Sequence, residues 1–242
     1  MNILSIIIAL TVATTVIDES TTFYNEGNRL VRESSYSLAL ESYNKLTVAN
    51  PELEYNRGFA YFQLGNLGKA MLHFNRALLY EPAHKNALIA IKELNKIKFN
   101  KVDMEDELMI QSGLLYKISY NQILSIGVII VFLLAISTIF MIFKTKSEAA
   151  EQVTLLLLVL FFLTSSFGLL KFYFSYHDNR GVVTSKEAKV YRNSSINSDH
   201  ILTAHEATIL KILSYEGSFA KIELSNQLVG WVDKNKIERI KI

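Results

Sequence analysis

The five histidines of the chain, with the carboxylates near them, are the side chains that could bind a metal ion or transfer protons. No histidine is followed by His, Asp or Glu three or four residues later, the spacing that places two ligands on one helix face. His200, His205 and Glu206 come nearest to a ligand set, yet a zinc site needs three or four converging ligands. We therefore expect no metal site.

Two other stretches carry residue types that do chemistry. The run from Gly65 to Lys69 has two residues between its glycines and Ala70 after its lysine, whereas a phosphate-binding loop has four and then Ser or Thr. We interpret this run as a turn. The second stretch is acidic and contains Asp103, Glu105, Asp106 and Glu107. It has no apolar surroundings that would raise the pKa of a carboxyl group, so we interpret it as a solvated charge run.

The composition narrows the function classes further. The sequence contains no cysteine, which excludes thiol catalysis and iron–sulfur clusters. The net charge of +2 is too small to suggest a nucleic-acid footprint. We predict no catalytic residue and no cofactor, and expect the protein not to be an enzyme.

The middle of the chain predicts membrane insertion. No charged residue occurs from Ile118 to Phe143 or from Gln152 to Leu170, and a spanning helix needs roughly 20 apolar residues. We expect one span over 118–143 and a second over 152–174. The segment between them, 144–151, is long enough only for a hairpin loop, so the two spans are antiparallel.

The N-terminal segment, residues 1–17, has an apolar run from Ile3 to Leu10 of the length used by export signals. The alternatives are a cleaved signal peptide, an uncleaved anchor and, least favoured, a buried helix. The first two place the next segment outside the cytoplasm, and the hairpin returns the chain to that side. We therefore expect the loop at 144–151 to be cytoplasmic.

Residues 21–98 contain an internal repeat. Four positions of the first unit recur 31 residues later with similar residue types: Gly27, Ala39, Tyr43 and Pro51 recur as Gly58, Ala70, Phe74 and Pro82. The spacing resembles the tetratricopeptide repeat (TPR), a pair of antiparallel helices. Small residues allow the two helices to approach, Gly65 makes the turn between them, and the prolines end the second helix of each unit. The period is three residues short of the usual 34, which we expect to shorten the first helix of unit two.

Two repeats do not bury their faces alone, and residues 84–98 are expected to form a closing helix. In TPR proteins the first helices line a groove that binds peptides. The repeat pattern predicts these groove residues here: Tyr24, Asn28, Val31, Tyr55, Phe59 and Phe62. Either the three aromatic residues of unit two are exposed for an interface, or the closing helix covers them. Since Tyr24 stands where a carboxylate clamp has lysine, an apolar partner segment is favoured.

The C-terminal region, residues 179–242, changes to short runs of β-forming residues. Five strands are expected, with a hairpin turn at Tyr215–Ser218. The order of Val190–Arg192, the Gly217 turn and Gly230–Val232 resembles a bacterial SH3-like domain, a small barrel. Trp231 is expected in the barrel core rather than at a ligand platform.

The order of the parts is a further signature. Export segment, TPR domain (21–98), linker (99–117), two spans and SH3-like domain together resemble the BatE-like members of the Bat aerotolerance family. The fold class is thus a multidomain membrane protein with all-α repeats, a transmembrane hairpin and an all-β barrel. The resemblance implies a bacterial inner-membrane scaffold with its TPR and SH3-like domains on the periplasmic side.

The resemblance also implies partners. It suggests that the TPR groove docks von Willebrand-type Bat proteins beside a MoxR-type ATPase, with the hairpin held in membrane lipid. The alternative is a cell-wall-binding protein whose SH3-like domain holds peptidoglycan. The two hypotheses differ in which module carries the binding site.

Overall fold

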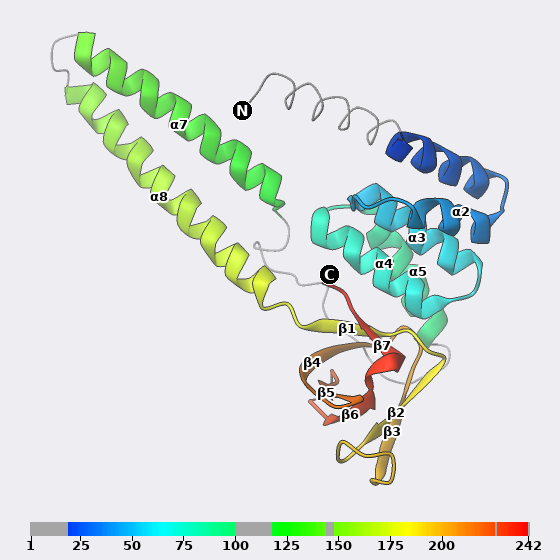
Figure 1. Ribbon diagram of the computed structural model, residues 1–242. Helices are drawn as coiled ribbons and strands as arrows, with labels where there is room; N and C mark the ends of the chain where they lie inside the picture. The colour runs from blue at the N-terminus through cyan, green and yellow to red at the C-terminus, as the bar shows by residue number, and fades with distance from the viewer. Residues whose placement is uncertain (1–18, 100–117, 144–147, 226, 242) are drawn as a thin grey trace, which may run out of the picture. The chain divides into compact units, whose positions relative to one another are not determined.

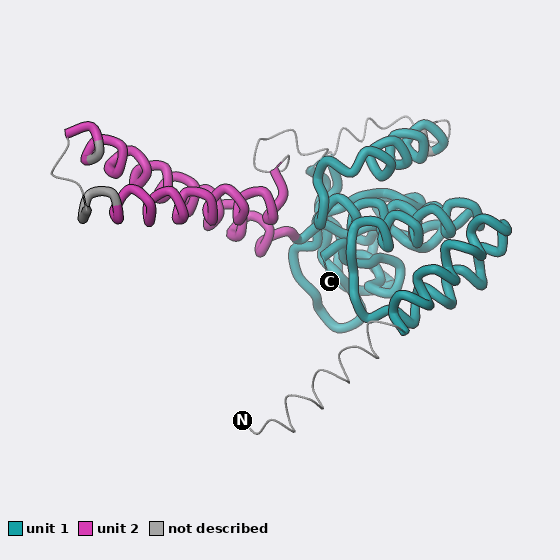
Figure 2. The backbone as a smooth tube through the Cα atoms, turned by 90° about the horizontal axis from the view of Figure 1, so that it is seen from above, with its two compact units in different colours: residues 1–108, 179–242 teal, residues 109–178 magenta. Residues whose placement is uncertain are grey.

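The structure, a computed structural model, describes residues 19–99, 118–143, 148–225 and 227–241 (Figure 1). The chain forms two compact units (Figure 2). Residues 1–108 and 179–242 make up the first unit, and residues 109–178 make up the second. The predicted signal segment and all but the first residue of the predicted linker lie outside the described residues.

The first unit begins with a helical hairpin array. Residues 19–32 are helical, and four further helices follow: α2 (Tyr36–Asn44), α3 (Pro51–Gln63), α4 (Leu67–Tyr80) and α5 (Lys85–Phe99). Asparagine side chains cap two of these helices, because Asn50 accepts a hydrogen bond from the Leu53 amide (2.8 Å) and Asn66 from the Lys69 amide (3.1 Å). Gly65 has a φ of +73° in the turn between α3 and α4, which confirms its predicted role.

The repeated small and large residues meet as predicted. A Cβ on Gly58 would lie 2.6 Å from the ring of Phe74, and one on Gly27 would collide with the ring of Tyr43. Each glycine therefore admits the aromatic residue found sixteen positions later in its own repeat. Three alanines at positions where the repeat favours small residues are also fully buried: Ala39, Ala70 and Ala77.

The prediction for Pro51 is wrong. This residue begins α3 rather than ending the preceding helix, since its fixed φ suits the first turn and its missing N–H is not needed there. The shortened helix is α2, with 9 residues against 14 in α4, and not the first helix of unit two. Arg57 donates to the carbonyl oxygen of Tyr43 (2.6 Å). It so satisfies a carbonyl in the last turn of the shortened helix α2.

The second unit contains two long apolar helices, α7 (Tyr120–Phe143) and α8 (Glu148–Tyr176). Within them, Tyr120–Ile139 and Glu151–Tyr176 are long and apolar enough to cross a membrane, and few of their side chains are buried. The hydroxyl oxygens of Ser137 and Thr154 lie 2.7 Å apart, which joins the two helices. Helix α8 includes the last four residues of the predicted loop, whose first four lie outside the described residues.

The C-terminal part of the first unit is an antiparallel sheet of seven strands, not five. They are β1 (Arg180–Val183), β2 (Glu187–Tyr191), β3 (His200–His205), β4 (Ile209–Glu216), β5 (Phe219–Glu223), β6 (Val229–Asp233) and β7 (Ile237–Arg239), with a short 3₁₀ helix, η1 (Lys234–Lys236), before β7. The order is β3-β2-β6-β5-β4-β1-β7, so β3 and β7 are edge strands in the observed pairing. This pairing does not close the sheet into the predicted barrel. Gly217 has a φ of +56° in the predicted turn between β4 and β5.

The prediction that Trp231 lies in the core is also wrong. Its strand neighbours Gly230 and Val232 are buried, whereas Trp231 is half-buried and faces the other side of the sheet, because side chains alternate along a strand. It pairs across the sheet with Lys221 and Tyr191. The core is instead aliphatic and includes Val190, Leu210, Ile212, Ala220, Ile222 and Val232.

Candidate functional site

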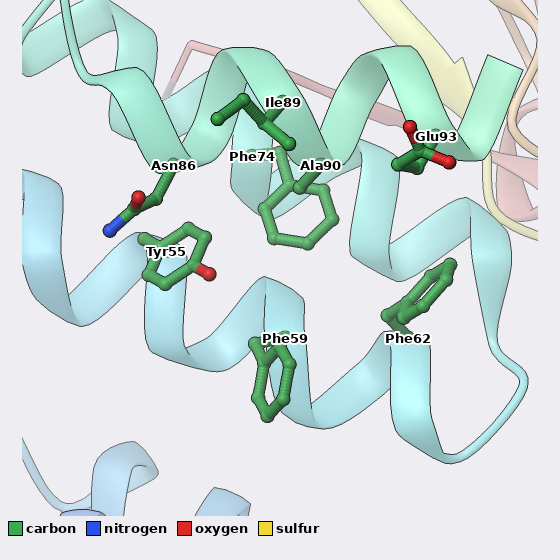
Figure 3. A pocket seen from close by; sticks show the side chains of 8 residues that line it. All are labelled: Tyr55, Phe59, Phe62, Phe74, Asn86, Ile89, Ala90 and Glu93. Atoms are coloured by element: carbon green, nitrogen blue, oxygen red, sulfur yellow. The ribbon is translucent and has the colours of Figure 1, made fainter.

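An apolar cavity lies between α3 and α5 in the helical part of the first unit (Figure 3). It contains about 530 Å³ of empty space, including its open mouth. Its walls carry mainly aromatic and aliphatic side chains, with one amide and one carboxylate: Tyr55, Phe59, Phe62, Phe74, Asn86, Ile89, Ala90 and Glu93. Cavities with this balance of apolar wall and few polar groups are typical binding sites.

Helical spacing places these residues on one face of each helix. Tyr55, Phe59 and Phe62 follow one another at four and three residues along α3, so they share a face. On α5 the lining residues from Asn86 to Glu93 repeat in the same way, and Figure 3 shows them opposite the aromatic rings of α3. Phe74 of α4 lies between the two walls.

The closing helix forms the second wall of this groove and does not cover it. The opposite face of α5 is buried through Ala87, Ile91 and Leu94. Ile89, on the groove face, is 60% exposed. The alternative in which α5 covers all three aromatic residues is therefore not what the structure shows, although the rings of α3 are half-buried.

The aromatic residues of the groove support one another. The ring of Tyr55 lies 5.8 Å from Phe74 and 6.4 Å from Phe59, and Tyr36 of α2 meets Phe59 edge-on at 6.2 Å. Such pairs add to the free energy gained from burial. Burial, and secondarily the Glu52 carboxylate, raise the pKa of the Tyr55 hydroxyl, so this group stays protonated and can donate a hydrogen bond.

The three predicted groove residues of unit one are not among those that line this cavity. Asn28 accepts hydrogen bonds from the Tyr43 hydroxyl (2.7 Å) and the Asn56 amide (3.0 Å), so its oxygen joins the two repeats. Tyr24 has its ring 6.3 Å from that of Tyr43, and both Tyr24 and Val31 pack against a separate apolar cluster. Half of the predicted set is thus brought together at one cavity.

A buried polar cluster was missed by the sequence analysis. Glu54 of α3 is fully buried and accepts hydrogen bonds from Nδ1 of His73 (2.8 Å) and from Arg57 (2.7 Å). The Tyr61 ring stacks on His73 at 5.3 Å. Burial lowers the pKa of His73, although the hydrogen bond that His73 donates to Glu54 opposes this shift. The cluster ties α3 to α4, and a charged residue on the buried face of α3 was the signal for it.

The predicted absence of a metal site was argued from His200, His205 and Glu206. In the structure His200 lies 3.1 Å from the hydroxyl of Thr203, while Glu206 accepts from the Gly68 amide (3.0 Å) and Lys186 (2.6 Å). The side chains of His200 and Glu206 are therefore engaged elsewhere. Within the described ranges, no three His, Asp or Glu side chains are grouped to hold a metal ion.

A comparison with protein families bears on the same region. The tetratricopeptide repeat family model matches residues 51–84, which comprise α3, α4 and the connection to α5. No curated protein matches the chain significantly. A TPR supports a role in protein–protein interaction, because stacked repeats present concave binding surfaces.

Proposed function

We propose that this protein is a membrane-anchored, non-enzymatic scaffold that docks a partner protein in the groove between α3 and α5. The observation that carries the proposal is the open cavity lined by Tyr55, Phe59, Phe62 and Ile89 within a TPR region. Exposed apolar patches of this kind mark interaction sites. Large aromatic residues often supply most of the binding energy.

The chemistry of the lining favours an apolar segment of the partner. Its aliphatic or aromatic side chains would enter the cavity between the rings of α3 and Ile89. The polar groups of Asn86 and Glu93 lie on the α5 wall and would bind the partner's backbone amides. Apolar anchors with a few oriented polar contacts are the usual arrangement of such sites.

The two apolar helices support the membrane part of the proposal. With their length and composition, α7 and α8 would hold the protein in a bacterial inner membrane. The apolar N-terminal segment favours export, and so a periplasmic position for the TPR region.

The order of the parts resembles that of BatE-like proteins, which makes a von Willebrand-type Bat protein the first partner to test. Peptidoglycan binding through the C-terminal sheet stays a prediction, to which the described contacts add nothing.

The test replaces Ile89 with glutamate in the full-length protein. Ile89 is 60% exposed, so the change costs little folding energy but places a charge on the apolar wall. We expect capture of the partner to fall by about tenfold or more, which corresponds to about 1.4 kcal/mol. Co-purification from membranes under crosslinking measures the capture.

The matched control is Ile97→Glu. Ile97 lies two turns further along α5, is 40% exposed and does not line the cavity. We expect this variant to bind as the wild type does. Equal partner capture by Ile89→Glu and the wild type, with unchanged thermal unfolding, would show that the groove is not the docking site.

A further inference from the structure

The C-terminal sheet packs directly against the TPR helices within the first unit. One apolar cluster contains Leu72 of α4, Ile91 of α5, and Val182, Ile209 and Ile240 of the sheet region. Leu72, Val182 and Ile240 are fully buried. The two parts are separated in sequence by the whole apolar hairpin, yet they share a hydrophobic core.

Gly68 shows how closely the two backbones approach. A Cβ at this position would lie 2.5 Å from the carbonyl oxygen of Val183 and 2.7 Å from the Cα of Thr184. The Gly68 amide also donates to the Glu206 carboxylate (3.0 Å). Glu206 therefore places its negative charge at the N-terminus of α4, where free amides and the helix dipole favour it.

Side-chain contacts continue this interface along α4. Lys69 forms an ion pair with Glu238. One turn after Leu72, Arg76 donates to the carbonyl oxygens of Arg239 and Ile240, both at 3.0 Å. These groups contact the C-terminal residues of the sheet, so the α4 face is engaged from Lys69 to Arg76.

We propose that the C-terminal sheet caps the repeat array, in the place where a further repeat would pack, and that it thereby holds both parts of the first unit on one side of the membrane. Repeat arrays need a terminal cap because their last apolar face is otherwise exposed. Helix α5 covers part of that face, and the sheet covers the rest through the shared cluster.

The membrane topology follows from the shared core. A hydrophobic core cannot form between segments that a bilayer separates, and the two segments are joined through α7 and α8. Both helices must then cross, which returns the chain to its starting side. This second part rests on the membrane insertion proposed above, whereas the capping does not.

Gly68→Ala in the full-length protein tests the cap. Alanine stabilises a free helix relative to glycine, so an uncapped α4 would exchange its amide hydrogens more slowly in this variant. With the sheet docked, the new methyl group collides with the β1 backbone. We expect exchange in Leu67–Tyr80 and Arg180–Val183 to accelerate by about tenfold or more.

The control is Ser37→Ala, the equivalent position of the first repeat, which is exposed and should leave exchange in both segments unchanged. Unchanged or slower exchange in Gly68→Ala would overturn the cap.

If Gly68→Ala fails to fold, charge reversals at the Lys69–Glu238 ion pair replace it as the test. Lys69→Glu and Glu238→Lys should each accelerate exchange, and the double variant should restore the wild-type rate. Equal exchange rates in the two single variants and the double variant would overturn the proposal.

Thiol labelling tests the topology. Since the chain has no cysteine, Glu41→Cys on α2 and Glu216→Cys on β4 each provide one exposed reporter. A membrane-impermeant maleimide applied to sealed cells with an opened outer membrane should give the same result for both. Labelling of only one would overturn the shared side. A protein found outside the membrane fraction would refute the proposed anchoring, while the exchange experiment would still test the cap.

Discussion

His73 and Glu54 form the most buried polar pair in the repeat, and their protonation affects folding. Burial lowers the pKa of His73 below the ordinary value of 6.5, against the opposing hydrogen bond with Glu54. Burial opposes ionisation of Glu54, yet the contacts with His73 and Arg57 together lower its pKa below 4.5. In both cases the unfolded chain binds the proton more readily than the folded one.

The stability of the first unit should therefore fall in acid. The histidine contribution is present above about pH 6.5 and is lost as the pH falls through the folded-state pKa; that of Glu54 follows at lower pH. His73→Gln should flatten the decrease of the unfolding free energy between about pH 7.5 and 5.5. Denaturant unfolding at several pH values measures it. His205→Gln, at an exposed position, should keep the wild-type slope, and an unaltered slope in His73→Gln would refute this account.

Residue-level prediction succeeded where a short-range pattern determines the contact. The offset between Gly58 and Phe74 is repeated by Gly27 and Tyr43, and both pairs touch. The Glu54–His73 pair lies on two helices and has no counterpart in the other repeat, so the repeat pattern does not predict it, and the charge on the buried face of α3 was its only signal. Trp231 was misplaced because a one-residue difference in strand parity reverses the face of the sheet.

At the scale of elements, Arg57 joins the end of α2 to α3. Its side chain is 13% exposed, and it pairs with the fully buried Glu54 while donating to the Tyr43 carbonyl. Removing one partner of a buried ion pair leaves the other charge uncompensated and costs about 3–5 kcal/mol. Arg57→Met should therefore destabilise the first unit by about that amount in thermal or denaturant unfolding.

Arg29 provides the matched comparison. It pairs with Glu26 and Glu33 on the surface of the helix at residues 19–32, with a side chain that is 49% exposed. Exposed pairs contribute about 0–1 kcal/mol, so Arg29→Met should change stability little. If the two variants were equally stable, the buried cluster would not connect the helices as described.

The sequence predicted the types of the elements better than their number and boundaries. Helical repeats, two apolar helices and a strand-rich C-terminus were all predicted. The sheet has two strands more than the five that were expected. Strand β7 has three residues, and β1 is packed against α4 as well as its sheet neighbours, so neither shows the alternation of a half-buried strand.

At the scale of the whole molecule, the apolar hairpin predicts firm membrane attachment. The exposed side chains of α7 and α8 would be poorly solvated in water. Full-length protein should float with lipid vesicles in a density gradient and resist extraction by alkaline carbonate. Recovery in the soluble fraction without detergent would refute the membrane anchor.

The docking of the sheet on the repeats could not be predicted from the sequence. Its contacts join residues such as Arg76 and Ile240 across more than half of the chain, and no local periodicity specifies such a pairing. The groove was half predicted, since helical spacing identified the α3 wall but could not show that α5 stands beside it without covering it.

Site-specific photo-crosslinking tests the central claim, that the groove between α3 and α5 holds a partner protein. A photoreactive phenylalanine analogue at Phe59 lies in the cavity wall, whereas the same group at Leu64, which caps α3 and is 49% exposed, lies outside it. In intact cells the account predicts a discrete adduct from position 59 that Ile89→Glu abolishes, and none from position 64. Equal adducts from both positions, or none from position 59 with the protein folded and in the membrane, would contradict it.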